Sequence, residues 1–167
     1  MATSRRKVTF PARAAGPMPE QWLSIDPGGS KPTAVATWFG GRCTDVLQID
    51  RARLAHWLHF ADPWLIVLEE GFAGRINPQA AAQMSETRGV VLAVADLCGA
   101  EVVRVHPDQW RGVLGLPARR KAGAGTLNAA EAALCKLLQG VPDGATNADT
   151  RAAFLIGEAA RRAWCVA

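Results

Sequence analysis

The stretch Trp64-Leu-Ile-Val-Leu-Glu69 begins with the most apolar run of the chain and ends in a charged residue. It directly follows Pro63, and its first five residues show no alternation between apolar and polar types. A short run of this kind is typical of a strand that is buried on both faces of a sheet. We therefore expect a central strand here, with helices covering both of its sides.

Turn signals on either side of this strand divide the chain into further short elements. Gly40-Gly41 predicts a two-residue hairpin turn, Asp50 is placed to cap a helix, and Asn77-Pro78 is a favourable helix start. We expect strands over 22–26, 33–39, 42–49, 64–68 and 101–105, helices over 50–59, 77–98, 127–138 and 146–163, a short helical turn over 107–114 and a basic loop over 117–125. This order predicts an α/β domain with a five-stranded mixed sheet flanked by helices on both faces.

Length and charge indicate one domain with an anionic partner. The 167 residues are 49% hydrophobic and 20% charged, which is enough to fill one core. The net charge of +4 is concentrated in two segments: residues 1–20 carry four basic residues against one acidic, and residues 101–125 carry five against two. Such patches favour nucleic acid over a membrane as partner. We expect a flexible basic arm over 1–20 and a folded domain over 21–167; the alternative for 1–19 is an organelle transit peptide.

Several classes of protein are disfavoured. No apolar run reaches the roughly 18–20 residues that a membrane span needs, and no apolar segment follows the basic N-terminus as it would in a secretory signal. The four cysteines are scattered, which favours reduced thiols and a cytoplasmic location. Gly28-Gly29 is not followed by the Gly-Lys-Ser/Thr of a phosphate-binding loop, so we expect no nucleotide cofactor.

Three carboxylates occupy positions that favour chemistry. Asp26 ends the first expected strand, Glu69 ends the most apolar strand, and Asp149 lies at the start of the last helix. A charge at the end of a buried strand is costly unless it is paired or bound to a cation, and carboxylates are the ligands that Mg²⁺ prefers. Two such ions about 3.5–4 Å apart can hydrolyse phosphodiesters. The alternative is that these acids are ordinary strand-end and helix-cap residues.

At this point the motifs resemble a known family, the RuvC family of Holliday junction resolvases. Leu23-Ser-Ile-Asp26-Pro-Gly28 is similar to its first-strand motif, and Val67-Leu-Glu69-Glu70-Gly-Phe72 is similar to its second acidic motif. Residues 77–90 resemble the following long helix, and residues 148–157 resemble the last one. The resemblance implies a ribonuclease H-like fold over 21–167, a homodimer, and cutting of four-way DNA junctions with two Mg²⁺ ions per site, for which Mn²⁺ would substitute.

Carried over to this chain, the resemblance makes Asp26, Glu69 and Asp149 metal ligands and catalytic residues, with Glu70 as the alternative to Glu69 if the strand register differs by one. It also implies an aspartate three residues after Asp149, but position 152 is alanine. We interpret Ala152 as an aspartate-to-alanine replacement that inactivates the chain. The alternative is that Ala152 is natural, either in an enzyme that uses three carboxylates or in a non-catalytic protein that binds junctions.

Candidate DNA contacts come from the same resemblance and from the basic loop. Phe72 matches an aromatic residue that stacks on bases at the junction centre, or else it fills the core. Arg111 and Lys121 fall near two basic residues beside the active site, and Arg119 and Arg120 extend the basic loop; such a loop can grip phosphates or be a solvated surface. The predicted function is paired, symmetric incision of four-way junctions that leaves 5′-phosphate and 3′-hydroxyl ends. A nuclease for flaps or other branched DNA is the alternative enzyme.

Overall fold

The computed structural model describes residues 9–13, 16–28, 31–71, 78–118 and 123–164. Its centre is a five-stranded sheet in the order β3-β2-β1-β4-β5. The strands β1 (Gln21–Asp26), β2 (Thr33–Phe39) and β3 (Arg42–Ile49) form an antiparallel meander, while β4 (Leu65–Glu69) and β5 (Glu101–Val105) continue the sheet in parallel with β1. All five residues of β4 are buried, as the apolar run predicted.

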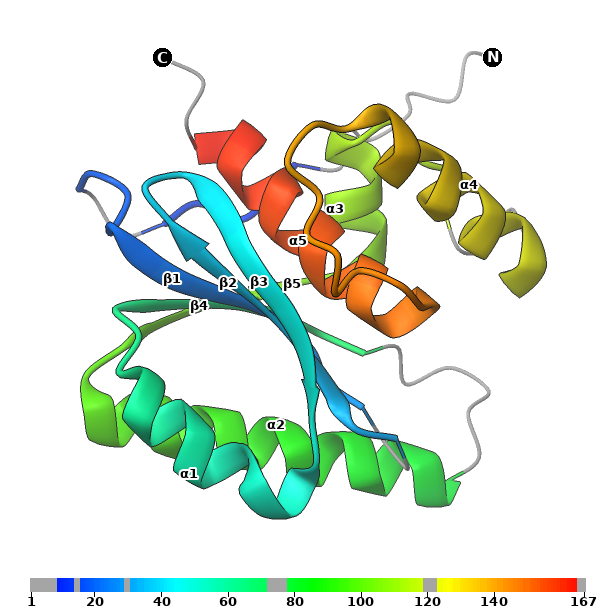
Figure 1. The fold of residues 1–167 in the computed structure, drawn as a ribbon. Helices are drawn as coiled ribbons and strands as arrows, with labels where there is room; N and C mark the ends of the chain where they lie inside the picture. Colours follow the sequence, from blue (N-terminus) through cyan, green and yellow to red (C-terminus); the bar gives the residue numbers. More distant parts are fainter. Residues whose placement is uncertain (1–8, 14–15, 29–30, 72–77, 119–122, 165–167) are drawn as a thin grey trace, which may run out of the picture.

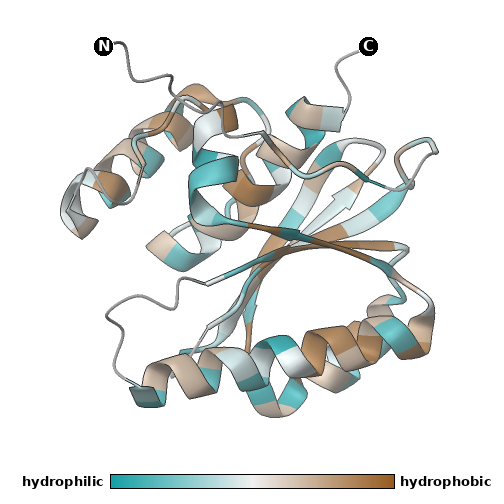
Figure 2. Ribbon diagram, turned by 180° about the vertical axis from the view of Figure 1, so that it is seen from behind, coloured by the Kyte–Doolittle hydropathy of each residue, from teal (hydrophilic) through white to brown (hydrophobic). Residues whose placement is uncertain are grey.

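Helices cover both faces of the sheet, as Figure 1 shows. The helices α1 (Arg51–Ala61) and α2 (Pro78–Cys98) lie on one face, and the opposite face carries α5 (Ala148–Trp164) with α3 (Pro107–Val113) and α4 (Ala124–Leu137) beside it. The side chains of each strand alternate between two separate apolar clusters, one on each side of the sheet. The central strands are accordingly brown in the hydropathy view of Figure 2. The predicted mixed sheet flanked on both faces is therefore confirmed.

The predicted hairpin and helix starts are found with two local differences. Gly40 and Gly41 both have positive φ, 55° and 75°, as a two-residue hairpin turn requires. Helix α1 begins directly after Asp50, but the Asp50 side chain makes no cap hydrogen bond; its backbone carbonyl accepts from Arg53 N at 2.8 Å instead. Helix α4 begins at Ala124, inside the expected basic loop, and its N-cap residue is Gly123, whose backbone is extended.

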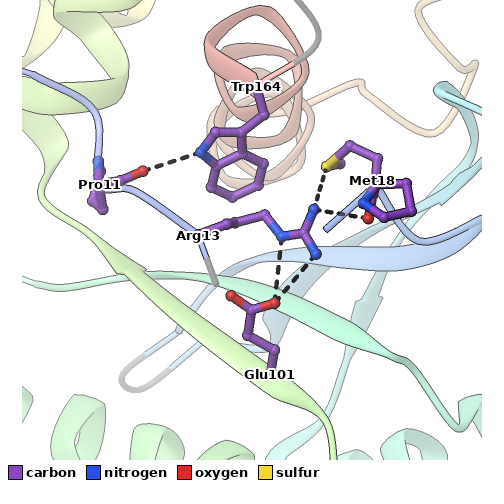
Figure 3. Close-up of polar contacts among 6 residues, drawn as sticks. Pro11, Arg13, Met18, Glu101 and Trp164 are labelled. Atoms are coloured by element: carbon purple, nitrogen blue, oxygen red, sulfur yellow. Dashed lines mark hydrogen bonds and ion pairs between the residues drawn. The ribbon is translucent and has the colours of Figure 1, made fainter. Parts of the chain in front are cut away.

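Part of the expected N-terminal arm lies against the domain (Figure 3). The guanidinium of Arg13 donates from Nε and Nη2 to Glu101 Oε2, both at 3.3 Å, and its Nη1 donates to the carbonyl of Pro17. Trp164 Nε1 donates to the Pro11 carbonyl at 3.0 Å, and Phe10 packs edge-on against the Trp164 ring. Residues 9–13 are therefore docked on β5 and the end of α5, whereas the basic residues 1–8 lie outside the described residues.

Candidate active site

The register of β1 and β4 brings two of the predicted carboxylates to the same edge and face of the sheet. Ile25 pairs with Leu68 in parallel register, so Asp26 and Glu69 each follow one member of that pair. Ile25 and Leu68 point into the apolar cluster under α1 and α2. Because side chains alternate along a strand, Asp26 and Glu69 face the opposite side, toward α5.

The turn after β1 is closely packed, and this packing fixes the end of the strand at Asp26. A Cβ atom at Gly28 would lie 2.3 Å from the carbonyl oxygen of Lys31 and 2.5 Å from that of Pro32, so only glycine fits here. The carbonyl of Gly28 also accepts a hydrogen bond of 3.0 Å from Thr87 Oγ1 on α2. This hydrogen bond joins the turn to α2.

Helix α5 lies close to β1 and carries the third carboxylate. Asn147 and Thr150 cap its start reciprocally: Thr150 N donates to Asn147 Oδ1 at 3.0 Å, and Asn147 N donates to Thr150 Oγ1 at 3.1 Å. Ser24, which shares the face of Asp26, donates to the α5 carbonyl of Ala153 at 2.7 Å. Asp149 and Ala152, three residues apart on one side of the helix, are thereby directed toward the end of β1.

One cleft of about 450 Å³ brings these residues together. Its lining includes Asp26, Glu69 and Asp149, which we predicted as metal ligands, and Ala152, which has no side-chain ligand atom. Lys31 Nζ lies 3.7 Å from Asp149 Oδ2 at the same cleft. The neighbouring carboxylate Glu70 points away from the cleft and pairs with Arg104 at 3.8 Å. The structure therefore places Glu69, and not the alternative Glu70, beside Asp26.

The carboxylates of the cleft repel one another. Desolvation raises the pKa of Asp26 well above its usual value, and the negative charges of Glu69, Asp149 and Glu131 raise it further against the opposing charge of Arg111. Within the described part of the chain, no three His, Cys, Asp or Glu side chains are close enough to form a ready-made metal cluster. The donor set nevertheless fits a hard divalent cation in chemistry, because its oxygens are carboxylates whose repulsion a cation would relieve.

Helix α3 places one residue, Trp110, against Glu69. His106 caps this helix by accepting from Asp108 N at 3.2 Å, and Pro107 occupies its first turn, where its missing N–H is not needed. The buried Trp110 then donates from its indole Nε1 to Glu69 Oε2 at 2.7 Å. Sequence analysis did not identify Trp110 as a residue of the site.

Of the residues predicted to contact DNA, the structure describes only Arg111. Arg111 lines the cleft beside the predicted metal ligands, where it is only 8% exposed and pairs with Glu131. Sequence analysis missed Glu131, although it shares one helix face with the buried residues Leu127 and Cys135 at four-residue spacing. Phe72, Arg119, Arg120 and Lys121 lie outside the described residues. Their roles in DNA binding stay predictions.

No helix within the described residues has the length and apolar character to cross a membrane. Neither a protein-family model nor a curated protein matches the sequence.

Solved structures do match the fold. RuvC of T. thermophilus, solved in complex with Holliday junction substrate, has 19% identity and a TM-score of 0.63, and the match covers 87% of this chain and 96% of that chain.

Two further resolvases share the architecture. The fowlpox virus resolvase, solved with substrate Holliday junction DNA, has 14% identity and a TM-score of 0.61 over 84% of this chain and 96% of its own. The yeast mitochondrial Holliday junction resolvase has 16% identity and a TM-score of 0.51 over 86% of this chain and 78% of its own. This chain has the fold of RuvC and of these other Holliday junction resolvases.

Proposed function

We propose that this protein is a metal-dependent endonuclease domain that recognises four-way DNA junctions, and that in this chain the cutting step is blocked at Ala152. The observation that carries the proposal is the cleft in which Asp26, Glu69 and Asp149 meet on a fold shared with resolvases. Two strand ends and one helix start supply these carboxylates.

Asp26, Glu69 and Asp149 would hold divalent cations, Mg²⁺ or Mn²⁺, at this cleft. Such ions would activate water and stabilise the leaving 3′ oxygen of a phosphodiester, which gives 5′-phosphate and 3′-hydroxyl ends. The chain's own contribution is to position ligands: Trp110 fixes one oxygen of Glu69, and the cap of α5 fixes the start of the helix that carries Asp149. An aspartate at position 152 would add a fourth carboxylate on the same helix face.

A homodimer would place two such clefts on opposite strands of a two-fold symmetric junction. We propose α2 as the interface helix, because its small residues Ala80, Ala81 and Ala82 permit close approach. A non-catalytic junction-binding protein is the second candidate. It is favoured by one observation, the alanine that stands in the cleft where a ligand is expected.

The test compares this chain with its Ala152→Asp variant on a synthetic immobile four-way junction, with Mg²⁺ or Mn²⁺ and with linear duplex as control. We expect both proteins to bind the junction and only Ala152→Asp to nick it symmetrically. Junction binding without cleavage by either protein would support the non-catalytic candidate. Equal affinity for junction and duplex would contradict junction recognition.

A further inference from the structure

Helix α4 places a buried glutamate against the cleft. Glu131 is 3% exposed and lies between Leu127 and Cys135 on the inward face of the helix. A buried carboxylate is costly unless hydrogen bonds and an opposite charge compensate it. Its partner is Arg111 on α3, which donates to Glu131 Oε1 from Nη2 at 2.8 Å and from Nε at 3.1 Å. The two side chains therefore fix each other beneath the site.

This pair is continuous with the carboxylates of the cleft. The guanidinium carbon of Arg111 lies 4.3 Å from the centre of the Trp110 ring, at a distance typical of a cation–π contact. The indole of Trp110 in turn donates to Glu69 Oε2 at 2.7 Å. Glu131 thus determines the placement of Arg111, and Arg111 packs on the residue that orients Glu69.

One donor of this arrangement is left over. Nη1 of Arg111 is buried and has no hydrogen-bond partner among the described residues. Both Arg111 and Glu131 line the cleft together with Asp26 and Asp149. A buried charged donor without an acceptor costs free energy, and the residue that carries this donor lines the cleft. The unpaired Nη1 therefore points to an acceptor that arrives with the ligand. An anionic oxygen is the acceptor that a guanidinium prefers.

We infer that Glu131 is a positioning residue, which holds Arg111 so that its free Nη1 binds a phosphate oxygen of the DNA backbone inside the cleft. The inference rests on the proposed function for the identity of the DNA, but the anion site is a property of this chain alone. Glu131 acts through Arg111 and does not itself touch the DNA. The role of Glu131 is therefore lost when Arg111 is removed.

Glu131→Gln keeps the shape of the side chain and removes its charge. The matched control is Glu158→Gln, because Glu158 is also buried, at 6% exposure, and pairs with two arginines, Arg161 and Arg162, outside this cleft. We expect Glu131→Gln to weaken junction binding in EDTA by roughly 10- to 100-fold, the effect of one charge-assisted hydrogen bond. The salt dependence of binding falls by about one phosphate contact. Glu158→Gln changes neither quantity.

A double-mutant cycle separates positioning from general damage. If Glu131 acts through Arg111, the double variant Arg111→Gln/Glu131→Gln binds no more weakly than Arg111→Gln alone. Additive losses, or a loss in Glu131→Gln no larger than in Glu158→Gln, would overturn the inference. If Glu131→Gln does not fold, Glu131→Asp, which keeps the charge, serves in its place. Its affinity for the junction is expected to lie between those of the unchanged chain and Arg111→Gln.

A second readout needs no DNA. In ¹⁵N–¹H spectra, the Arg111 Nε–H signal of this chain is expected to shift on titration with inorganic phosphate, and the corresponding shift is lost in Glu131→Gln. If the chain binds neither junction nor duplex, the proposed function fails, and this titration alone decides the inference. A shift in this chain but not in the variant supports it, and no shift in either protein overturns it.

Discussion

Gly157 allows α5 to approach the sheet closely, and its replacement by alanine should be destabilising. An alanine Cβ would lie 2.3 Å from Cε2 and from Nε1 of Trp38, far inside van der Waals contact. The Trp38 ring has no room to yield, because it is stacked between Trp22 and Phe154, with ring centres 4.8 and 5.7 Å away, and its Nε1 donates to Ser24 Oγ at 2.9 Å. Either the ring or the helix must move.

Overpacking of this kind costs about 1–3 kcal/mol, and a strained hydrogen bond adds about 0.5–1.5 kcal/mol. The better helix propensity of alanine returns about 1 kcal/mol. We therefore expect Gly157→Ala to lower the free energy of unfolding by about 2 kcal/mol, which corresponds to a fall of about 4–8 °C in Tm for a chain of this size.

The matched control is Gly89→Ala on α2, where an added Cβ would meet nothing within 4 Å. The same substitution should there raise stability by up to about 1 kcal/mol. Urea unfolding of the two variants, followed by tryptophan fluorescence, measures both effects. A Gly157→Ala protein as stable as the unchanged chain would refute the close approach of α5 to Trp38, and with it the placement of Asp149 beside Asp26.

Three further predictions concern charge. Because folding raises the pKa of Asp26, the metal-free protein should lose stability as the pH rises above about 4. Asp26→Asn should remove this loss and increase the free energy of unfolding by roughly 0.5–2 kcal/mol at neutral pH. Unfolding in EDTA, measured as a function of pH, tests this. Burial alone would raise the pKa of Glu158, but its two arginines outweigh burial and lower the pKa. The contribution of Glu158 to stability should therefore be present above about pH 4.3 and vanish as the pH falls through the lowered pKa. Glu158→Gln should lower the free energy of unfolding by about 1–2 kcal/mol at pH 7 and flatten the dependence of stability on pH at acidic pH. Arg13→Ala should release the segment that Glu101 anchors, so that chymotrypsin cleaves faster at Phe10 while the midpoint of unfolding falls by only a few degrees.

Local patterns in the sequence were enough to predict most of the fold. Turn signals predicted β2 and β3 with their observed bounds, and the lack of alternation identified β4 as the buried centre of the sheet. These signals work because each depends on neighbours a few residues away. The strands β1 and β4 end in Asp26 and Glu69, so strand prediction and the family motifs together placed two carboxylates of the site.

The missed parts of the structure depend on contacts between residues distant in sequence. Glu131 looks like an ordinary helical glutamate until Arg111, 20 residues earlier, is seen beside it. Residues 1–20 were expected to form a flexible arm, yet Arg13 binds Glu101, 88 residues away in the sequence. A buried ion pair carries no local pattern of its own. The one available signal was that Glu131 occupies an apolar position of its helix.

The most direct measurement is cleavage of a four-way junction by Ala152→Asp with and without Asp26→Asn, in Mn²⁺, with binding measured in parallel. We expect symmetric nicks from Ala152→Asp that a ligase can reseal, and no nicks once Asp26→Asn is added. Both proteins should bind the junction, and the double variant should be the more stable of the two without metal. Cleavage that survives Asp26→Asn would contradict the assignment of this cleft as the active site.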